Sequence, residues 1–277
     1  MKTDLTILVE NTTSHQALIG EWGFAALLNI DDHKLLFDTG QGDALFINSL
    51  QLGIPLEETE EIVISHGHFD HCGALLKLLK QIGPRPVTAH PRIFVKRYAV
   101  APSGRRIEVG CPFSEAEAVE AGARFRYSDK PLEIYPGVYI TGTIPRRTAY
   151  EDAGGRFVLQ SGEDLIEDYI EDDMALVIDH PQGLIILSGC AHAGTVNTLE
   201  YAREITGKRH IQAYIGGTHL MNASSERMEA TLSALLDELP DRIMIGHCTG
   251  FYPAAQLYQA LGHRVVKIDA GSHFTFI

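Results

Sequence analysis

The chain has 277 residues, of which 45% are hydrophobic and 21% charged, and its formal net charge is −13. This balance is typical of a globular protein with enough apolar residues for a sizeable core, and the length allows one or two domains. The negative charge argues against a nucleic-acid partner, because a phosphate backbone requires a basic surface. No stretch approaches the roughly 20 apolar residues that a membrane span needs.

Cysteine usage and the start of the chain indicate the compartment. The four cysteines are widely spaced, so a disulfide framework is not expected in a chain of this length. The apolar run near Met1 is too short for a signal peptide. We therefore expect a cytoplasmic protein without a membrane partner.

The first third of the chain alternates strands with helices. Short apolar runs bounded by turn residues predict strands, and apolar residues at helical spacing predict helices. The predicted strands are 5–9, 24–30, 34–37, 62–64 and 86–90, and the predicted helices are 41–52, a segment that begins at Gly73, and a short one that begins at Pro91. This order indicates an α/β protein.

The middle of the chain is harder to interpret. Residues 96 to about 130 show less regular patterning. The acidic segment 163–173 is expected to be a solvated loop or a short helix.

The last third returns to clear strands and helices. A hairpin is expected around Pro181-Gln182-Gly183. The predicted strands are 174–179, 184–187, 211–215, 242–245, 264–268 and 274–276, and the predicted helices are 195–205, 224–239 and 253–261.

A dense group of potential metal ligands follows the predicted strand that ends at residue 64. His66, His68, Asp70 and His71 lie within six positions, which is hard to attribute to ordinary core or surface residues. Side chains two apart on extended backbone can reach the same side, and the intervening glycine permits a close approach. One ion cannot easily take four ligands at this spacing, whereas two ions can. Imidazole and carboxylate together suit zinc, iron, manganese or nickel.

This His-x-His-x-Asp-His run resembles the signature of the metallo-β-lactamase-fold superfamily. Residues 35–41 (Leu-Leu-Phe-Asp-Thr-Gly-Gln) resemble its early strand that ends in Asp-x-Gly. Five further segments resemble a branch labelled dihydropterin-related or ribofuranosylaminobenzene-phosphate-synthase-like. They are 9–12 (Val-Glu-Asn-Thr), 141–145 (Thr-Gly-Thr-Ile-Pro), 188–197 (Ser-Gly-Cys-Ala-His-Ala-Gly-Thr-Val-Asn), 216–220 (Gly-Gly-Thr-His-Leu) and 246–250 (Gly-His-Cys-Thr-Gly).

The resemblance implies the fold class and the domain organisation. The expected class is α/β (α+β), as a four-layer αββα sandwich in which two mixed sheets pack face to face with helices outside. A single domain over residues 1–277 is expected, with an insertion around 96–156 over the active-site face or, alternatively, an ordinary surface connection there. The element order resembles a two-fold repetition, although no sequence repeat establishes it.

The resemblance also implies ligands for two divalent ions. His247 matches the last ligand histidine of the superfamily and is expected to join Asp70 and His71 on one ion. His192, which follows a strand in the same setting, is expected to complete the site of the first two histidines. Zinc is expected, with iron or manganese as alternatives.

Three further residues are candidates near these ligands. Cys190 stands where the superfamily has a bridging aspartate, so it is either a thiolate ligand or a small buried apolar residue. His219 is a metal ligand, a proton or hydrogen-bond donor to the substrate, or a structural histidine. Asp38 either hydrogen-bonds and orients a ligand histidine or is an ordinary turn residue.

Candidate substrate contacts are spread along the chain. Trp22 provides either an aromatic wall for a flat ligand or a packed hairpin residue. The other candidates are Asn11, Asn197 and Thr249.

The expected function is that of a metal-dependent hydrolase. A metal-bound hydroxide would attack a carbonyl or phosphoryl centre of a small ester or phosphoester, such as a pterin- or phosphate-bearing molecule. Asp70 would also orient the nucleophile, and His219 would stabilise the leaving group. The alternatives are a group-transferring synthase of pterin-type metabolism, a di-iron redox protein, and a non-catalytic metal-binding module. Homo-oligomerisation is left open.

Overall fold

The computed structural model describes residues 1–238 and 240–277. These residues divide into two compact units. The first unit comprises Met1–Lys96, Val109–Ser128 and Ile268–Ile277, and the second comprises Arg97–Glu108 and Asp129–Lys267. Leu239, the last residue of the predicted helix 224–239, lies outside the described residues. The single domain and the insertion around 96–156 stay predictions.

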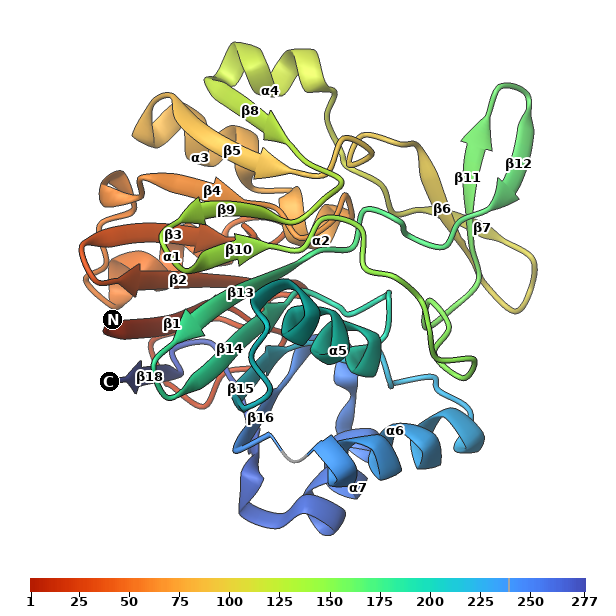
Figure 1. The fold of residues 1–277 in the computed structure, drawn as a ribbon. Coiled ribbons are helices and arrows are strands. Elements are labelled where there is room, and N and C mark those ends of the chain that lie inside the picture. The colour runs from red at the N-terminus through yellow and green to blue at the C-terminus, as the bar shows by residue number, and fades with distance from the viewer. Residues whose placement is uncertain (239) are drawn as a thin grey trace. The chain divides into compact units, whose positions relative to one another are not determined.

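The first unit is built on a mixed seven-stranded sheet in the order β18-β1-β2-β3-β4-β5-β8 (Figure 1). The pairs from β18 to β3 are antiparallel, and the pairs from β3 to β8 are parallel. The strands are β1 (Thr3–Val9), β2 (Ala25–Ile30), β3 (His33–Phe37), β4 (Glu61–Val63), β5 (Arg85–Ala89), β8 (Ala123–Tyr127) and β18 (His273–Phe276). The helices are α1 (Ala44–Gln51), α2 (Phe69–Cys72), α3 (Leu75–Ile82) and α4 (Glu115–Ala121).

The core of the first unit follows from the apolar pattern of these elements. Helix α3 buries Leu75, Leu78, Leu79 and Ile82, which lie on one face because they are spaced by three and four residues. Strand β4 is buried along its whole length, as expected for a strand between two parallel neighbours. The metal-ligand loop, which carries His66, His68, Asp70 and His71, therefore follows a fully buried strand.

The second unit contains another mixed seven-stranded sheet, in the order β17-β16-β15-β14-β13-β10-β9. Its strands are β9 (Leu132–Tyr135), β10 (Val138–Ile140), β13 (Ala175–His180), β14 (Gly183–Ser188), β15 (Ile211–Gly216), β16 (Arg242–Ile245) and β17 (Val265–Lys267). Its helices are α5 (Thr195–Thr206), α6 (Ser225–Glu238) and α7 (Phe251–Leu261).

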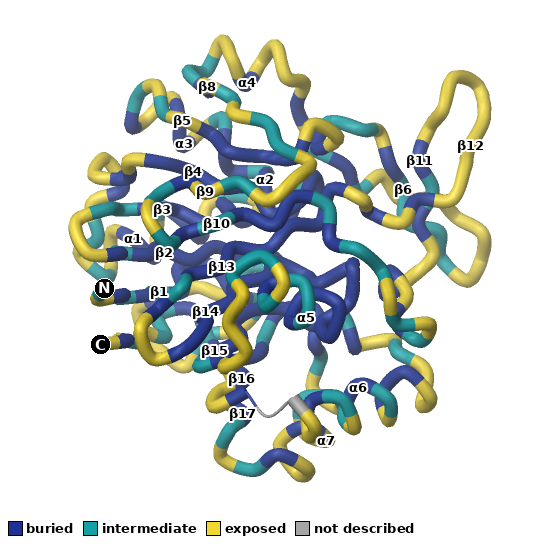
Figure 2. Tube along the Cα trace, in the orientation of Figure 1, coloured by how far each residue is buried: buried dark blue, intermediate teal, exposed yellow. Residues whose placement is uncertain are grey.

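A smaller sheet in the second unit has the order β12-β11-β6-β7. Its strands are β6 (Arg97–Val100), β7 (Arg106–Glu108), β11 (Phe157–Ser161) and β12 (Asp164–Glu167). Figure 2 shows the outer part of the β11–β12 hairpin exposed, while the inner strands of the larger sheets are buried.

The two larger sheets repeat one connectivity. Each has three antiparallel pairs followed by three parallel pairs: β9 to β14 is antiparallel, and β14 to β17 is parallel. Helices α5, α6 and α7 lie in the three parallel connections of the second sheet, as α1, α3 and α4 do in the first. The topology therefore shows the two-fold repetition that the element order indicated. Ligands in such sheets commonly bind beyond the carboxyl ends of parallel strands.

Three sequence-based expectations are wrong. The segment after residue 96 is regular, because short strands with alternating charged residues pair into sheets there. Pro91 begins a turn rather than a helix. The acidic segment 163–173 contains the exposed strand β12 rather than a loop or helix, and three of the four acidic residues that follow it are buried, Asp168, Asp172 and Asp173, whereas Glu171 is exposed.

The buried acids have a physical explanation in Arg97. This guanidinium is 1% exposed and forms ion pairs with Asp168 at 3.2 Å and Asp172 at 2.7 Å. Buried charges need such partners, and a charge run in the sequence does not reveal a partner about 70 residues away.

None of the helices among the described residues is long and apolar enough to cross a membrane.

Candidate metal centre

In the first unit, Asp38 holds the metal-ligand loop. It directly follows β3 and has a backbone φ of +60°, a left-handed conformation that non-glycine residues rarely adopt. Its buried carboxylate accepts hydrogen bonds from the Ser65 backbone N–H and hydroxyl, both at 2.7 Å, and contacts Nδ1 of His71 at 2.7 Å. A proton on His71 Nδ1 leaves Nε2 as the lone-pair donor, which is the geometry that an orienting role requires.

The two histidines that precede this contact face one another. His66 Nε2 lies 3.0 Å from His68 Nδ1, and both side chains are buried. Gly67 makes the approach possible, because a Cβ atom there would lie 2.0 Å from the backbone oxygen of Ile93. The thiol of Cys72 donates to the His68 carbonyl at 3.1 Å, so this cysteine supports the loop.

Asp70 lies beside His71, with Oδ2 3.8 Å from Nε2. Burial raises the pKa of the Asp70 carboxyl above its usual value, while His71 and a hydrogen bond from the Trp22 side chain act in the opposite direction. A bound cation would favour the ionised carboxylate. Trp22 is 45% exposed, and its link to Asp70 was not anticipated from the sequence.

In the second unit, His192 follows β14 and is fixed in the same manner as His71. Its Nδ1 lies 2.7 Å from the backbone oxygen of Ala153, so Nδ1 carries the proton and Nε2 remains the lone-pair donor. The Phe157 ring and the imidazole pack in a T-shaped arrangement, with ring centroids 5.4 Å apart. His192 itself is fully buried.

The second unit also brings Cys190 together with three histidines. Ligand atoms of Cys190, His192 and His219 lie within 4.8 Å of one another, and those of Cys190, His247 and Cys248 do as well. His219 and His247 have φ values of +49° and +50°. Strained backbone at both positions costs stability and is found preferentially at functional sites.

The available donor atoms suit a metal such as zinc or iron. Imidazole nitrogens, a carboxylate and a thiolate are the usual ligands of these ions. His71 and His192 each have Nδ1 bonded to a protein oxygen, the arrangement common among ligand histidines. The residues present therefore fit the metals that the sequence implied.

Comparisons with known proteins show the family of the chain. A sequence profile described as the Metallo-beta-lactamase superfamily matches residues 23–160. A relative from Methanocaldococcus jannaschii, 7,8-dihydropterin-6-methyl-4-(beta-D-ribofuranosyl)-aminobenzene-5'-phosphate synthase, is 30% identical over 264 residues, which cover 92% of this chain and 90% of the relative. The chain belongs to the metallo-β-lactamase superfamily. It is a metal-dependent enzyme of that superfamily, with buried, histidine-rich metal-binding groups.

Solved structures show the same fold. The crystal structure of Tm1679, described as a metal-dependent hydrolase of the beta-lactamase superfamily, has a TM-score of 0.82 at 24% identity and covers 98% of both chains. Zn²⁺-bound PqqB from Methylobacterium extorquens has a TM-score of 0.57 at 13% identity, covering 98% of this chain and 99% of PqqB. The expected metallo-β-lactamase fold, with two mixed seven-stranded sheets, is confirmed.

The candidate substrate contacts of this superfamily member have protein partners. Asn11 accepts from the Gly23 N–H at 3.1 Å, and Thr249 bonds the hydroxyl of Thr218 at 3.0 Å. The Asn197 amide accepts from two backbone N–H groups and donates to one hydroxyl and one carbonyl. These contacts fix the side chains within their own units, and substrate contact stays a prediction for all three residues.

Sequence reasoning missed the segment that supports His192. Ala153 contributes only a backbone oxygen, for which a sequence contains no signal. The neighbouring Glu151 accepts from the Val196 and Asn197 N–H groups at 2.8 and 2.9 Å and so caps the start of α5. The sequence shows Glu151 as an acidic residue near a glycine, but it does not show that this carboxylate bonds a helix about 45 residues later.

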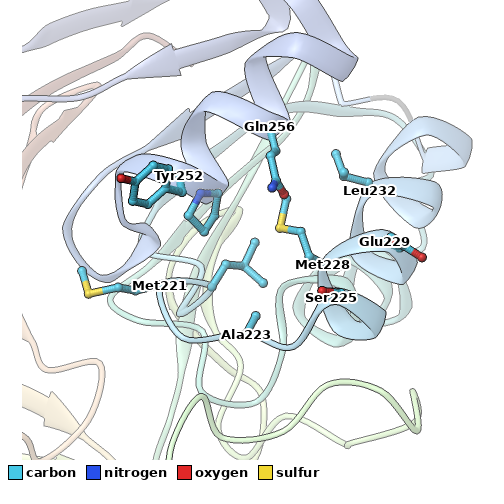
Figure 3. A pocket seen from close by; sticks show the side chains of 10 residues that line it. Met221, Ala223, Ser225, Met228, Glu229, Leu232, Tyr252 and Gln256 are labelled. Carbon is cyan, nitrogen blue, oxygen red and sulfur yellow. The ribbon is translucent and has the colours of Figure 1, made fainter.

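Two pockets of the second unit are lined by residues that neighbour candidate ligands along the chain: Leu220 follows His219, and Ala193 follows His192. One, of about 260 Å³, lies between α6, α7 and the loop after His219 (Figure 3). Gln256 and Met228 point toward one another across it, with Tyr252 at one side. The other, of about 290 Å³, includes Arg146 and Asp173. Both are lined by apolar and polar side chains together.

Proposed function

We propose that the two sets of ligands share two divalent cations and that this chain uses them to hydrolyse a small ester or phosphoester. The observation that carries the proposal is the matched fixing of His71 and His192, whose Nδ1 atoms are bonded to protein oxygens so that each Nε2 is available. Zinc is the first choice of metal, with iron and manganese as alternatives.

The ligand assignment follows the superfamily pattern. His66 and His68 would hold one cation with His192 from the second unit. Asp70 and His71 would hold the other with His247. His66, His192 and His247 each follow a strand that belongs to a parallel pair, namely β4, β14 and β16. This is the usual position for ligand-binding residues in such sheets.

Cys190 is the group most open to two roles. Its sulfur lies within 4.8 Å of ligand atoms of His192 and of His247, so it is near both second-unit ligands. As a thiolate it would take the place of the superfamily's bridging aspartate. As a thiol it would fill apolar space beside the ligands.

When bound, the cations would supply Lewis acidity and lower the pKa of a coordinated water. Asp70 would orient the attacking water through its second carboxylate oxygen. His219 would donate a proton or a hydrogen bond to the leaving group. The burial of Asp70 would limit competition from bulk water at that carboxylate.

A small molecule is the substrate that the charge and the pockets favour. With a net charge of −13, the chain would depend on its cations to attract an anionic group such as a phosphate. Pockets of about 260 and 290 Å³ would accommodate a compact molecule or part of a larger one.

A second candidate function is group transfer in pterin-type metabolism. The observation that favours it is the 30% identity, over 92% of this chain, to the Methanocaldococcus jannaschii synthase, whose name includes a dihydropterin and a ribofuranosyl-aminobenzene 5'-phosphate. The same cations would then activate a phosphate- or pterin-bearing donor instead of assisting attack by water.

The test begins with metal-free protein. After removal of metals with a chelator, the chain is reconstituted with zinc, manganese or iron and assayed on phosphodiester, phosphomonoester, carboxylic ester and lactone substrates. We expect two ions per chain and turnover only after reconstitution. Turnover that survives complete metal removal would overturn both functions. Iron with reversible visible bands would instead support the di-iron redox alternative, and tight metal binding without turnover would support the non-catalytic one.

A further inference from the structure

A buried arginine contacts the turn whose backbone carbonyl is bonded to His192. Arg227, on the first turn of α6, is 2% exposed. Its Nη1 donates to Asp152 Oδ1. Its Nε and Nη2 have no hydrogen-bond acceptor among the described residues. A buried guanidinium needs an anionic partner, and Asp152 supplies one.

Asp152 links this arginine to the backbone that fixes His192. The same Oδ1 atom accepts from the Gly154 N–H at 2.7 Å, so Asp152 closes a turn over residues 152–154. Within that turn, the Ala153 carbonyl is the atom that contacts His192 Nδ1. The guanidinium therefore reaches the imidazole through one carboxylate and one backbone turn.

The turn has little freedom on its other sides. Gly154, with φ +79°, lies so close to His219 that a Cβ atom there would be 1.9 Å from Nδ1. Before the turn, Glu151 is held by the first N–H groups of α5. The Arg227–Asp152 pair supplies the remaining anchor, on the side of α6.

We propose that Arg227 and Asp152 are positioning residues that set the metal affinity of His192 by holding the Ala153 carbonyl against its ring. The inference rests on the proposed function, in which His192 is a metal ligand. Groups that orient a ligand histidine typically change metal affinity 10- to 100-fold when removed.

The test uses Asp152, whose side chain is 73% exposed, and thermal unfolding of each variant checks that the fold is retained when the buried guanidinium loses this partner. Cobalt(II) is titrated into the metal-free chain, and its visible d–d bands report both affinity and geometry. D152A is expected to weaken the affinity of one ion about 10- to 100-fold and to change its bands. D152N keeps an oxygen that accepts from Gly154 and Arg227, and it is expected to stay within about threefold of the wild type.

R227M provides the second variant. It retains packing volume but removes the donor to Asp152, and it is expected to weaken the same ion about tenfold. Because both residues act through one carbonyl, the double variant should be little worse than D152A alone. The control is E204A, which removes the exposed Arg147–Glu204 ion pair of the same unit and should leave cobalt affinity unchanged.

The outcomes separate this inference from the proposed function. If the wild type bound fewer than two ions, the proposed function would fail. If the wild type bound two ions and D152A bound them equally well, only the positioning role would be overturned. A loss in D152N as large as that in D152A would also overturn it, since charge rather than carbonyl placement would then control affinity.

Discussion

Replacement of His68 by alanine is expected to leave the chain with one bound cation instead of two and to lower turnover by at least about a hundredfold. That figure is the upper end for residues that merely orient a ligand, so removal of a ligand should cost more. His68 is buried, and its Nδ1 lies 3.0 Å from His66 Nε2. The measurements are metal content per chain by elemental analysis and the initial rate on the best substrate of the reconstituted enzyme.

His33 provides the matched control for this variant. It is a partly exposed histidine whose ring contacts Glu60 at 3.1 Å. His33→Ala should keep two ions and full turnover. Equal turnover by His68→Ala and the wild type, both fully loaded with metal, would remove His68 from the site.

Replacement of Gly67 by alanine is expected to lower the free energy of unfolding of the metal-free chain by about 3 kcal/mol, the upper end for overpacking. The added Cβ atom would lie 2.0 Å from the Ile93 oxygen and 2.7 Å from its carbonyl carbon, and backbone atoms cannot move aside as a flexible side chain can. The metal-ligand loop would have to shift away from Ile93. Thermal unfolding should show a Tm lower by roughly 5–10 °C, together with weaker metal binding.

A second glycine separates crowding from backbone conformation. Gly53 has φ +67°, and a Cβ atom there would meet no atom within 4 Å. Gly53→Ala should cost only about 1 kcal/mol, which is the penalty for placing alanine in the left-handed region. If Gly67→Ala had no larger effect than Gly53→Ala, the close packing of the loop on Ile93 would be refuted.

The sequence allowed much of the fold to be predicted because the apolar pattern is strong where strands are fully buried. The strand predicted at 242–245 coincides with β16, Arg242–Ile245, and the hairpin around Pro181 joins β13 and β14 as expected. The weakly patterned strands were missed. β8 alternates arginines with aromatic residues, and its place beside β5 depends on a pairing distant in sequence.

The strand-end positions of the candidate ligands follow from the sequence for a similar reason, and their role as ligands stays a prediction. Histidines that follow an apolar strand can be recognised from the sequence, and in the structure His66, His192 and His247 follow the ends of β4, β14 and β16. What the sequence could not indicate were partners that are backbone atoms or lie far along the chain. The Ala153 carbonyl on His192 and the Trp22 side chain on Asp70 are of this kind.

The measurement that tests the shared-cation proposal most directly is anomalous X-ray diffraction from crystals of the zinc-loaded protein. We expect two anomalous peaks about 3.5–4 Å apart, the usual separation in two-metal sites. One should be coordinated by His66, His68 and His192, and the other by Asp70, His71 and His247. A single peak, or peaks whose ligands exclude His192 and His247, would contradict the proposal that the two sets of ligands share two cations.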